Sequence, residues 1–103
     1  MADYSTDIKT YFPNVNDAAV ASIVRYCGIA LQSADSSLVS GTDPKELATV
    51  RDGFAAKKLG LGAAAADAGI QTVLTQMQGV RQKSRVTFYY LLAEATGTMG
   101  KLG

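Results

Sequence analysis

The chain has 103 residues, of which 48% are hydrophobic and 18% are charged, and its formal net charge is +1. This length predicts one domain, and the composition is that of a chain that folds around a core. No apolar run approaches the roughly 20 residues of a membrane span, so no membrane segment is expected. The polar, acidic N-terminus is not the pattern of a secretory signal.

Histidine is absent, and cysteine occurs once, at Cys27. The missing histidine removes the commonest general base and metal ligand, and a single thiol cannot supply a zinc site or an internal disulfide. P-loop and Rossmann motifs are also missing from the sequence. We therefore expect a protein that is not an enzyme, that has no cofactor or metal, and that works in the reducing cytoplasm.

Two helices are predicted in the first third of the chain. Apolar residues at helical spacing indicate a short helix over 3–12 and a longer one over 17–33. Gly28 would then lie within the second helix, where it favours close approach of another backbone. A polar connector follows over 34–42, and its apolar pair Leu38–Val39 is expected to form a single turn that reaches the core.

The segment 43–46, D-P-K-E, is the clearest helix start in the chain. It offers an N-cap aspartate, a proline in the first helical position and a glutamate placed to reach back in a capping box. The helix is predicted to end at Gly60 in the left-handed conformation, with Leu61 folding back onto it. Its inner stripe consists of Leu47, Val50 and Phe54.

A further helix is predicted over 63–78, with Gly79 ending it. The alanine run at 63–66 is thin and is expected to pack closely against a neighbour, whereas Gly69 is expected to weaken the helix interior. The apolar positions follow helical spacing: Ala66, Ile70, Val73, Leu74 and Met77.

The last helix, over 86–96, is entered through the polar segment 81–85 and is apolar around most of its circumference. Such a helix is normally surrounded by other helices, so we expect it to be the central helix of the fold. Its predicted polar stripe is formed by Lys83, Thr87 and Glu94. The chain is thus predicted to be all-α, a single domain over 1–103 built as a compact orthogonal bundle of about five helices, with a frayed tail over 98–103.

Arg51 and Arg85 lie beside the apolar faces of their predicted helices. A guanidinium there is expected to run along the edge of the core and to pair with a carboxylate. Three carboxylates are possible partners: Asp35, Asp52 and Asp67. The alternative is that one or both arginines line a pocket for an anion.

Positive charge is concentrated in the second half of the chain, 51–103, which contains seven basic and three acidic residues. This pattern raises the alternative of an anion-binding or nucleic-acid-binding surface. The candidate residues are Arg51, Lys57, Lys58, Arg81, Lys83 and Arg85. Because the chain is almost neutral overall, solvated lysines and arginines are the simpler interpretation.

Cys27 falls on the apolar stripe of its predicted helix. The simplest interpretation is a small buried hydrophobic residue. A reactive thiol would need exposure and a basic neighbour, and the adjacent Arg25 points to the opposite side of the helix.

Two stretches resemble a known family: D-S-S-L-V-S-G-T-D-P-K-E-L-A-T-V-R-D-G-F-A-A-K-K-L-G-L at 35–61 and R-V-T-F-Y-Y-L-L-A-E at 85–94. Similar bacterial proteins of about 100 residues form a family that is known only as a domain of unknown function. The resemblance covers nearly the whole chain and implies a bacterial, cytoplasmic, stand-alone helical protein. It implies no catalytic residues. We expect a protein-interaction module whose partner is another protein or a second copy of the chain.

Overall fold

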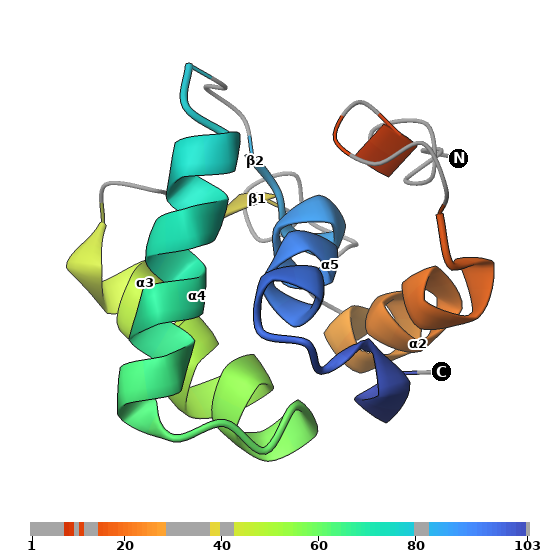
Figure 1. Ribbon diagram of the computed structural model, residues 1–103, viewed down its shortest axis with the longest axis horizontal. Coiled ribbons are helices and arrows are strands. Elements are labelled where there is room, and N and C mark those ends of the chain that lie inside the picture. The colour runs from red at the N-terminus through yellow and green to blue at the C-terminus, as the bar shows by residue number, and fades with distance from the viewer. Residues whose placement is uncertain are drawn as a thin grey trace.

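Helices α2, α3 and α4 are arranged around a central helix, α5, in the computed structural model of the chain (Figure 1). The structure describes residues 8–9, 11, 15–28, 38–39, 43–79 and 83–102. The elements are α2 (Asp17–Cys27), β1 (Leu38–Val39), α3 (Pro44–Val50), the π-helix η2 (Arg51–Lys58), α4 (Ala63–Gln76), β2 (Lys83–Ser84), α5 (Arg85–Ala95) and the 3-10 turn η3 (Met99–Lys101). The predicted all-α class is confirmed, and the Cα radius of gyration of 12.2 Å is that of a compact chain.

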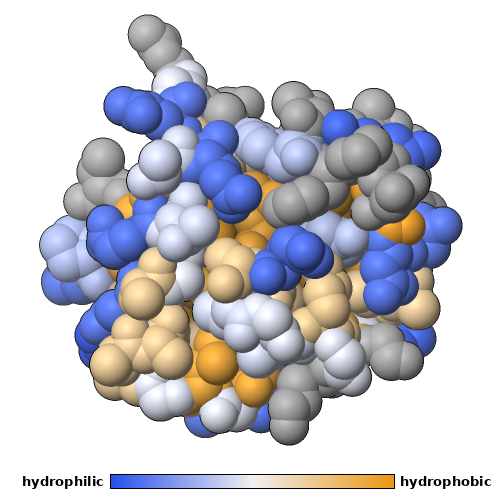
Figure 2. Space-filling view, viewed as in Figure 1, coloured by the Kyte–Doolittle hydropathy of each residue, from blue (hydrophilic) through white to orange (hydrophobic). Residues whose placement is uncertain are grey.

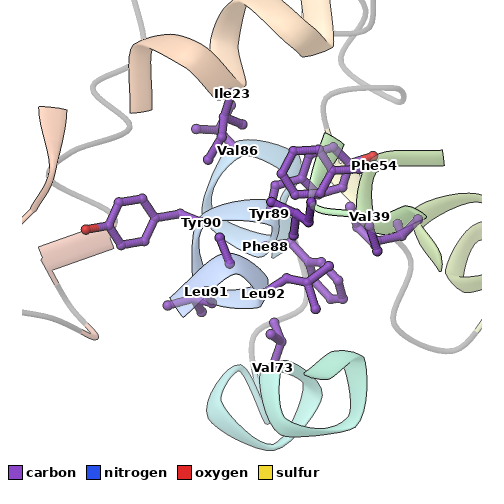
Figure 3. Close-up of a cluster of buried hydrophobic side chains, with 14 of the residues drawn as sticks. Ile23, Val39, Phe54, Val73, Val86, Phe88, Tyr89, Tyr90, Leu91 and Leu92 are labelled. Carbon is purple, nitrogen blue, oxygen red and sulfur yellow. The ribbon is translucent and has the colours of Figure 1, made fainter. Parts of the chain in front are cut away.

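The central position of α5 is confirmed by its burial. Every residue from Arg85 to Ala93 is buried, and Phe88, Leu91 and Leu92 are 0% exposed. Figure 3 shows Leu92 and Phe88 directed toward Val73 of α4. The predicted polar stripe is wrong at Thr87, which is also 0% exposed because neighbours cover α5 on all sides of its first two turns.

The described residues contain four helices rather than the five predicted, if α3 and η2 are taken as one continuous helix. The predicted first helix over 3–12 lies mostly outside the described residues. Ile8 and Lys9 within it are helical, and Ile8 is fully buried. No helix in the described part of the chain is both long and apolar enough to cross a membrane.

Helix α2 ends at Cys27, earlier than predicted, and the rest of the predicted helix, 29–33, lies outside the described residues. The helix ends there because the φ of +45° at Gly28 leaves the right-handed helical region. Gly28 therefore ends the helix instead of lying within it. At the other end, Asn16 accepts a hydrogen bond from the Ala19 N–H at 3.1 Å, and its own N–H donates to the Tyr90 hydroxyl at 2.9 Å, which ties α2 to α5.

The apolar pair Leu38–Val39 is an extended strand and not the predicted turn. β1 pairs antiparallel with β2, with Leu38 opposite Ser84 and Val39 opposite Lys83. Val39 is 2% exposed, so it does reach the core as expected. The two-residue sheet fixes the chain at the entrance to α5.

Helix α3 continues into η2, and the end of this helix follows the sequence prediction. Gly60 takes a φ of +69°, and the Leu61 N–H returns to the Ala55 carbonyl at 2.9 Å. The change from α to π hydrogen bonding at Arg51 was not predicted. It brings four residues of the helix into the core: Val50, Phe54, Ala55 and Leu59.

Close packing of α4 occurs at Gly69 and, within the predicted alanine run, at Ala66 alone, which is 1% exposed. Ala63, Ala64 and Ala65 are exposed, and a weakly hydrophobic area lies over the start of α4 in Figure 2. Gly69 is buried, and a Cβ placed there would come within 2.5 Å of Thr96 Cγ2. The glycine thus allows α4 to approach α5, which is its reason for being in the helix interior.

The C-terminal tail differs from the predicted fraying. Met99–Lys101 form a 3-10 turn, and Leu102 is only 6% exposed. The apolar side chain of Leu102 joins the same core as α5. Burial of this side chain holds the described part of the tail against the helices.

Candidate functional site

A buried polar group lies at the first turn of α5. Arg85, the first residue of this helix, is 9% exposed. Its Nη1 donates to the Tyr89 hydroxyl at 2.9 Å, and its Nη2 donates to Glu46 Oε1. The prediction that Arg85 pairs with a carboxylate is therefore confirmed. Burial alone would lower the pKa of Arg85, but Tyr89 and Glu46 outweigh it and the pKa is raised, so the guanidinium stays charged.

Glu46 is the partner that the sequence analysis did not name. Asp43 is the N-cap of the helix as predicted, since its side chain accepts from the Lys45 N–H at 2.9 Å, but the Glu46 side chain does not form the second half of the capping box. Glu46 instead turns to Arg85, 39 positions away in the chain. Of the partners proposed for the two arginines, Asp52 and Asp67 lie beside Arg51, and Asp35 lies outside the described residues.

Three aromatic rings extend this group toward the surface. Phe54 stacks on Tyr89 with ring centroids 4.1 Å apart, and Tyr26 forms a T-shaped pair with Phe54 at a centroid distance of 5.3 Å. Figure 3 shows the rings of Phe54 and Tyr89 overlapping beside α5. Tyr26 is 43% exposed, so the stack runs from the core to solvent. Such ring pairs contribute about 0.5–1.5 kcal/mol each beyond the area that they bury.

Cys27 lies beside the same group and is half-buried. Burial raises the pKa of its thiol to about 11, although the positive charge of Arg85 opposes this shift. The thiol is therefore protonated at neutral pH and is a poor nucleophile. This agrees with the interpretation of Cys27 as a small hydrophobic residue, and its basic neighbour is Arg85 rather than Arg25.

We call Arg85, Glu46, Tyr89, Phe54, Tyr26 and Cys27 the Arg85 cluster. It draws on α2, α3, η2 and α5, so it lies where these elements meet. A family model described as "Protein of unknown function (DUF2853)" matches residues 3–100, which include the whole cluster. The chain belongs to the DUF2853 family. No curated protein matches it.

The DUF2853 match confirms the resemblance drawn from segments 35–61 and 85–94, since both lie inside the matched range. The described residues of this DUF2853 chain contain no group of three or more His, Cys, Asp and Glu side chains that could hold a metal ion. The Arg85 cluster is thus a charged and aromatic junction, with its guanidinium already bound by groups of the same chain.

The second predicted arginine of the DUF2853 chain also has acidic partners. Arg51 Nε lies 2.9 Å from Asp52 Oδ1, and its Nη1 lies 3.7 Å from Asp67 Oδ1 on α4. The hydrogen bond from Arg51 lowers the pKa of the Asp52 carboxyl. Because all three side chains are partly or largely exposed, such pairs contribute little to stability.

The remaining candidates for an anion site are divided between two places in this DUF2853 chain. Lys57 and Lys58 lie on η2, where Lys57 is exposed and Lys58 half-buried. Lys83 lies on β2 and is also half-buried, and Arg81 lies outside the described residues. Arg51 and Arg85 are in the ion pairs described above.

The positions of two members of the Arg85 cluster can be related to the sequence pattern. Glu46 lies four positions before Val50, on the inner side of its helix, and therefore faces the core as well as the helix start. Tyr26 lies off the apolar stripe of α2, which is what a ring at the edge of the core requires.

Proposed function

We propose that the protein is a non-catalytic protein-interaction module of the bacterial cytoplasm and that its contact surface is centred on Tyr26. The observation that carries this proposal is the exposure of this ring. In the described part of the chain, Tyr26 is the single large hydrophobic residue that is exposed, at 43%. Tyrosine is enriched among the residues that contribute most to protein–protein binding.

The Tyr26 ring is held in place before any partner arrives. It forms a T-shaped pair with the Phe54 ring, and its centroid lies 5.3 Å from that of Phe54 and 6.5 Å from that of Tyr89. Gly53 lies beneath its hydroxyl, where a Cβ would be 3.9 Å from the oxygen. Since the ring is already ordered, binding through it would lose little side-chain entropy.

The non-catalytic part of the proposal rests on the chemistry of the side chains. The sequence offers no histidine, and burial keeps the Cys27 thiol protonated at neutral pH. Arg85, the most buried charge of the cluster, is bound by Glu46 and Tyr89. These groups stabilise the junction of the helices, which leaves the exposed ring as the feature directed outward.

Site-specific photocrosslinking in the native cell tests the proposal. A benzophenone amino acid replaces Tyr26 in one strain and Thr72, an exposed residue of α4, in a control strain. We expect a discrete crosslinked product from position 26 and not from position 72, with a product of twice the chain mass if the partner is a second copy. Equal products from both positions, or none from position 26, would contradict a surface centred on Tyr26.

A second candidate is binding of an anion or nucleic acid by the basic residues of η2 and β2. It is favoured by one observation: none of the ion pairs among the described residues involves Lys57 or Lys58. Titration with a DNA duplex at increasing salt tests it, because affinity that comes from phosphate contacts falls steeply with salt. Binding that persists at physiological salt and is lost in Lys83→Glu would favour this candidate over the protein partner.

A further inference from the structure

The helix that begins at Pro44 changes its hydrogen-bond spacing at Arg51. Pro44–Val50 is α-helical, and the eight residues of Arg51–Lys58 are π-helical. In Figure 1 this helix runs from α3 into the green segment that leads to α4. π-Turns are rare and are mostly single-turn features, so a segment of this length requires a cause in the packing.

Burial along the segment follows the wider turn. A helix with i→i−5 bonds rotates by roughly 82° per residue instead of about 100°. Counted from Val50, this rotation places Phe54, Ala55 and Leu59 within about 50° of one direction. These three residues and Val50 are at most 1% exposed. The exposed residues of the segment are on the other side: Asp52, Ala56 and Lys57.

An α-helix of the same sequence would keep Phe54 on the core face but would exchange the sides of Leu59 and Lys57. At about 100° per residue, Leu59 would lie about 180° from Val50, on the solvent side. Lys57 would lie about 20° from Val50, on the core side. Burying an unpaired ammonium costs far more than the strain of widened turns, so the sequence selects the π-helix.

We infer that Lys57 and Lys58 are a two-residue surplus: the segment has two residues more than an α-helix with the same number of turns. The π-turns accommodate these two residues on the solvent side, and the fold does not require them. Without the pair, Leu59 would follow Val50 by seven residues. In an α-helix this spacing returns it to within about 20° of Val50, on the face that also holds Phe54. Both forms complete about two turns before Gly60, so the shortened helix still reaches the turn that leads to α4.

The surroundings of the two lysines agree with a surplus. Lys57 is exposed and Lys58 half-buried, and neither takes part in an ion pair between described residues. The π-helical turns place two adjacent positive charges at the C-terminal end of the helix, where the partial negative charge of the backbone favours them. They do so without moving Leu59 from the core.

Deletion variants test the inference by thermal unfolding, followed by far-ultraviolet circular dichroism. Removal of both Lys57 and Lys58 is expected to leave the midpoint within about 4 °C of the parent chain. Removal of Lys57 alone is expected to lower it by more than about 8 °C, because Lys58 would move to the core face and Leu59 would turn away from it. The larger deletion is thus expected to be the milder one.

Two controls separate helix register from other effects. The substitutions Lys57→Ala and Lys58→Ala together keep the chain length and are expected to leave the midpoint unchanged. Removal of Gln71 and Thr72, both exposed on α4, is expected to abolish cooperative unfolding, because it rotates Val73 and Met77 out of the core. A crystal structure of the chain without Lys57 and Lys58 is expected to show a continuous α-helix from Pro44.

Three results would overturn the inference. The first is a double lysine deletion that is as damaging as the α4 deletion. The second is a single deletion that is milder than the double one. The third is a shortened chain that folds but keeps π-helical hydrogen bonds, since the surplus would then not be their cause.

Discussion

Arg85 and Glu46 lie 39 positions apart in the sequence, and their ion pair joins the first turn of α5 to the first turn of α3. The positive end of a helix dipole favours Glu46 at its position and disfavours Arg85 at the start of α5. The carboxylate of α3 therefore relieves an unfavourable charge at the start of the central helix. This relationship fixes how the two helices meet.

The two partners of this pair are expected to respond unequally to removal. Glu46→Leu leaves a guanidinium with 11% side-chain exposure, whereas Arg85→Met leaves a carboxylate with 25% exposure that can turn toward water. We expect Glu46→Leu to cost about 3–5 kcal/mol and Arg85→Met about 1–3 kcal/mol of unfolding free energy, measured in urea. Equal losses would show that both charges are equally enclosed in the folded protein.

The sequence predicted this pair only in part, for a physical reason. The cost of an unpaired guanidinium requires a partner for Arg85 whatever the fold, so pairing could be predicted. The identity of the partner could not, because Glu46 also had a local role available at the start of its helix. In the structure the Asp43 side chain forms the N-cap, and the Glu46 carboxylate accepts from Arg85 instead.

The helices were predicted correctly where the sequence pattern alone determines the structure, and not where the particular packing determines it. Apolar residues cover most of α5, so its central position follows from any packing of the chain. In η2, the α-helical rotation of 100° per residue places Phe54 and Leu59 on different faces of the helix. Only the wider π-helical turn places both residues on the core face. The pairing of β1 with β2 involves two residues on each side, which is too short for an alternating pattern.

Gly69 is expected to tolerate no side chain. A Cβ at this position would lie 2.5 Å from Thr96 Cγ2 and 2.8 Å from Leu92 Cδ1. Gly69→Ala is therefore expected to destabilise the fold by about 1–3 kcal/mol, although alanine is the better helix former. Thermal unfolding measures the loss.

Two variants serve as controls for Gly69→Ala. Gly62→Ala introduces a Cβ at the N-cap of α4, where no atom lies within 4 Å, and is expected to change stability by less than about 1 kcal/mol. Thr96→Ser removes Cγ2 and keeps the hydroxyl that donates to the Leu92 carbonyl at 2.8 Å. It is expected to recover part of the loss, and an absence of recovery would show that Leu92 is the limiting contact.

The N-cap residues of α3 and α5 are expected to differ in their contribution to stability. Asp43 accepts a hydrogen bond from the Lys45 N–H, so Asp43→Ala is expected to cost about 0.5–2 kcal/mol.

The hydroxyl of Ser84 is buried and has no hydrogen-bond partner among the described residues. Ser84→Ala removes this unsatisfied group and is expected to be neutral or stabilising. Urea unfolding of both variants compares them, and a loss in Ser84→Ala equal to that in Asp43→Ala would show that the Ser84 hydroxyl is hydrogen-bonded in solution.

The Cys27 thiol is expected to make the protein less stable in alkaline solution. Burial raises the pKa of the thiol from 9.0 to about 11 in the folded protein, with Arg85 acting in the opposite direction. Between these pH values the unfolded chain releases the proton and the folded chain keeps it, so the unfolded state is favoured as pH rises. The contribution is fully present below pH 9 and is lost by about pH 11.

Cys27→Ala separates this effect from the titration of other groups in the same range. Burial also raises the pKa of Tyr89, against the influence of Arg85, so part of the alkaline loss is expected to persist in the variant. Urea unfolding from pH 8 to pH 11 is expected to give a steeper fall for the parent chain than for Cys27→Ala. In the same range, a disulfide reagent is expected to modify the folded thiol far more slowly than the unfolded one. Parallel stability curves for the two proteins, together with rapid modification of the folded thiol at pH 8, would place Cys27 in contact with solvent and remove it from the Arg85 cluster.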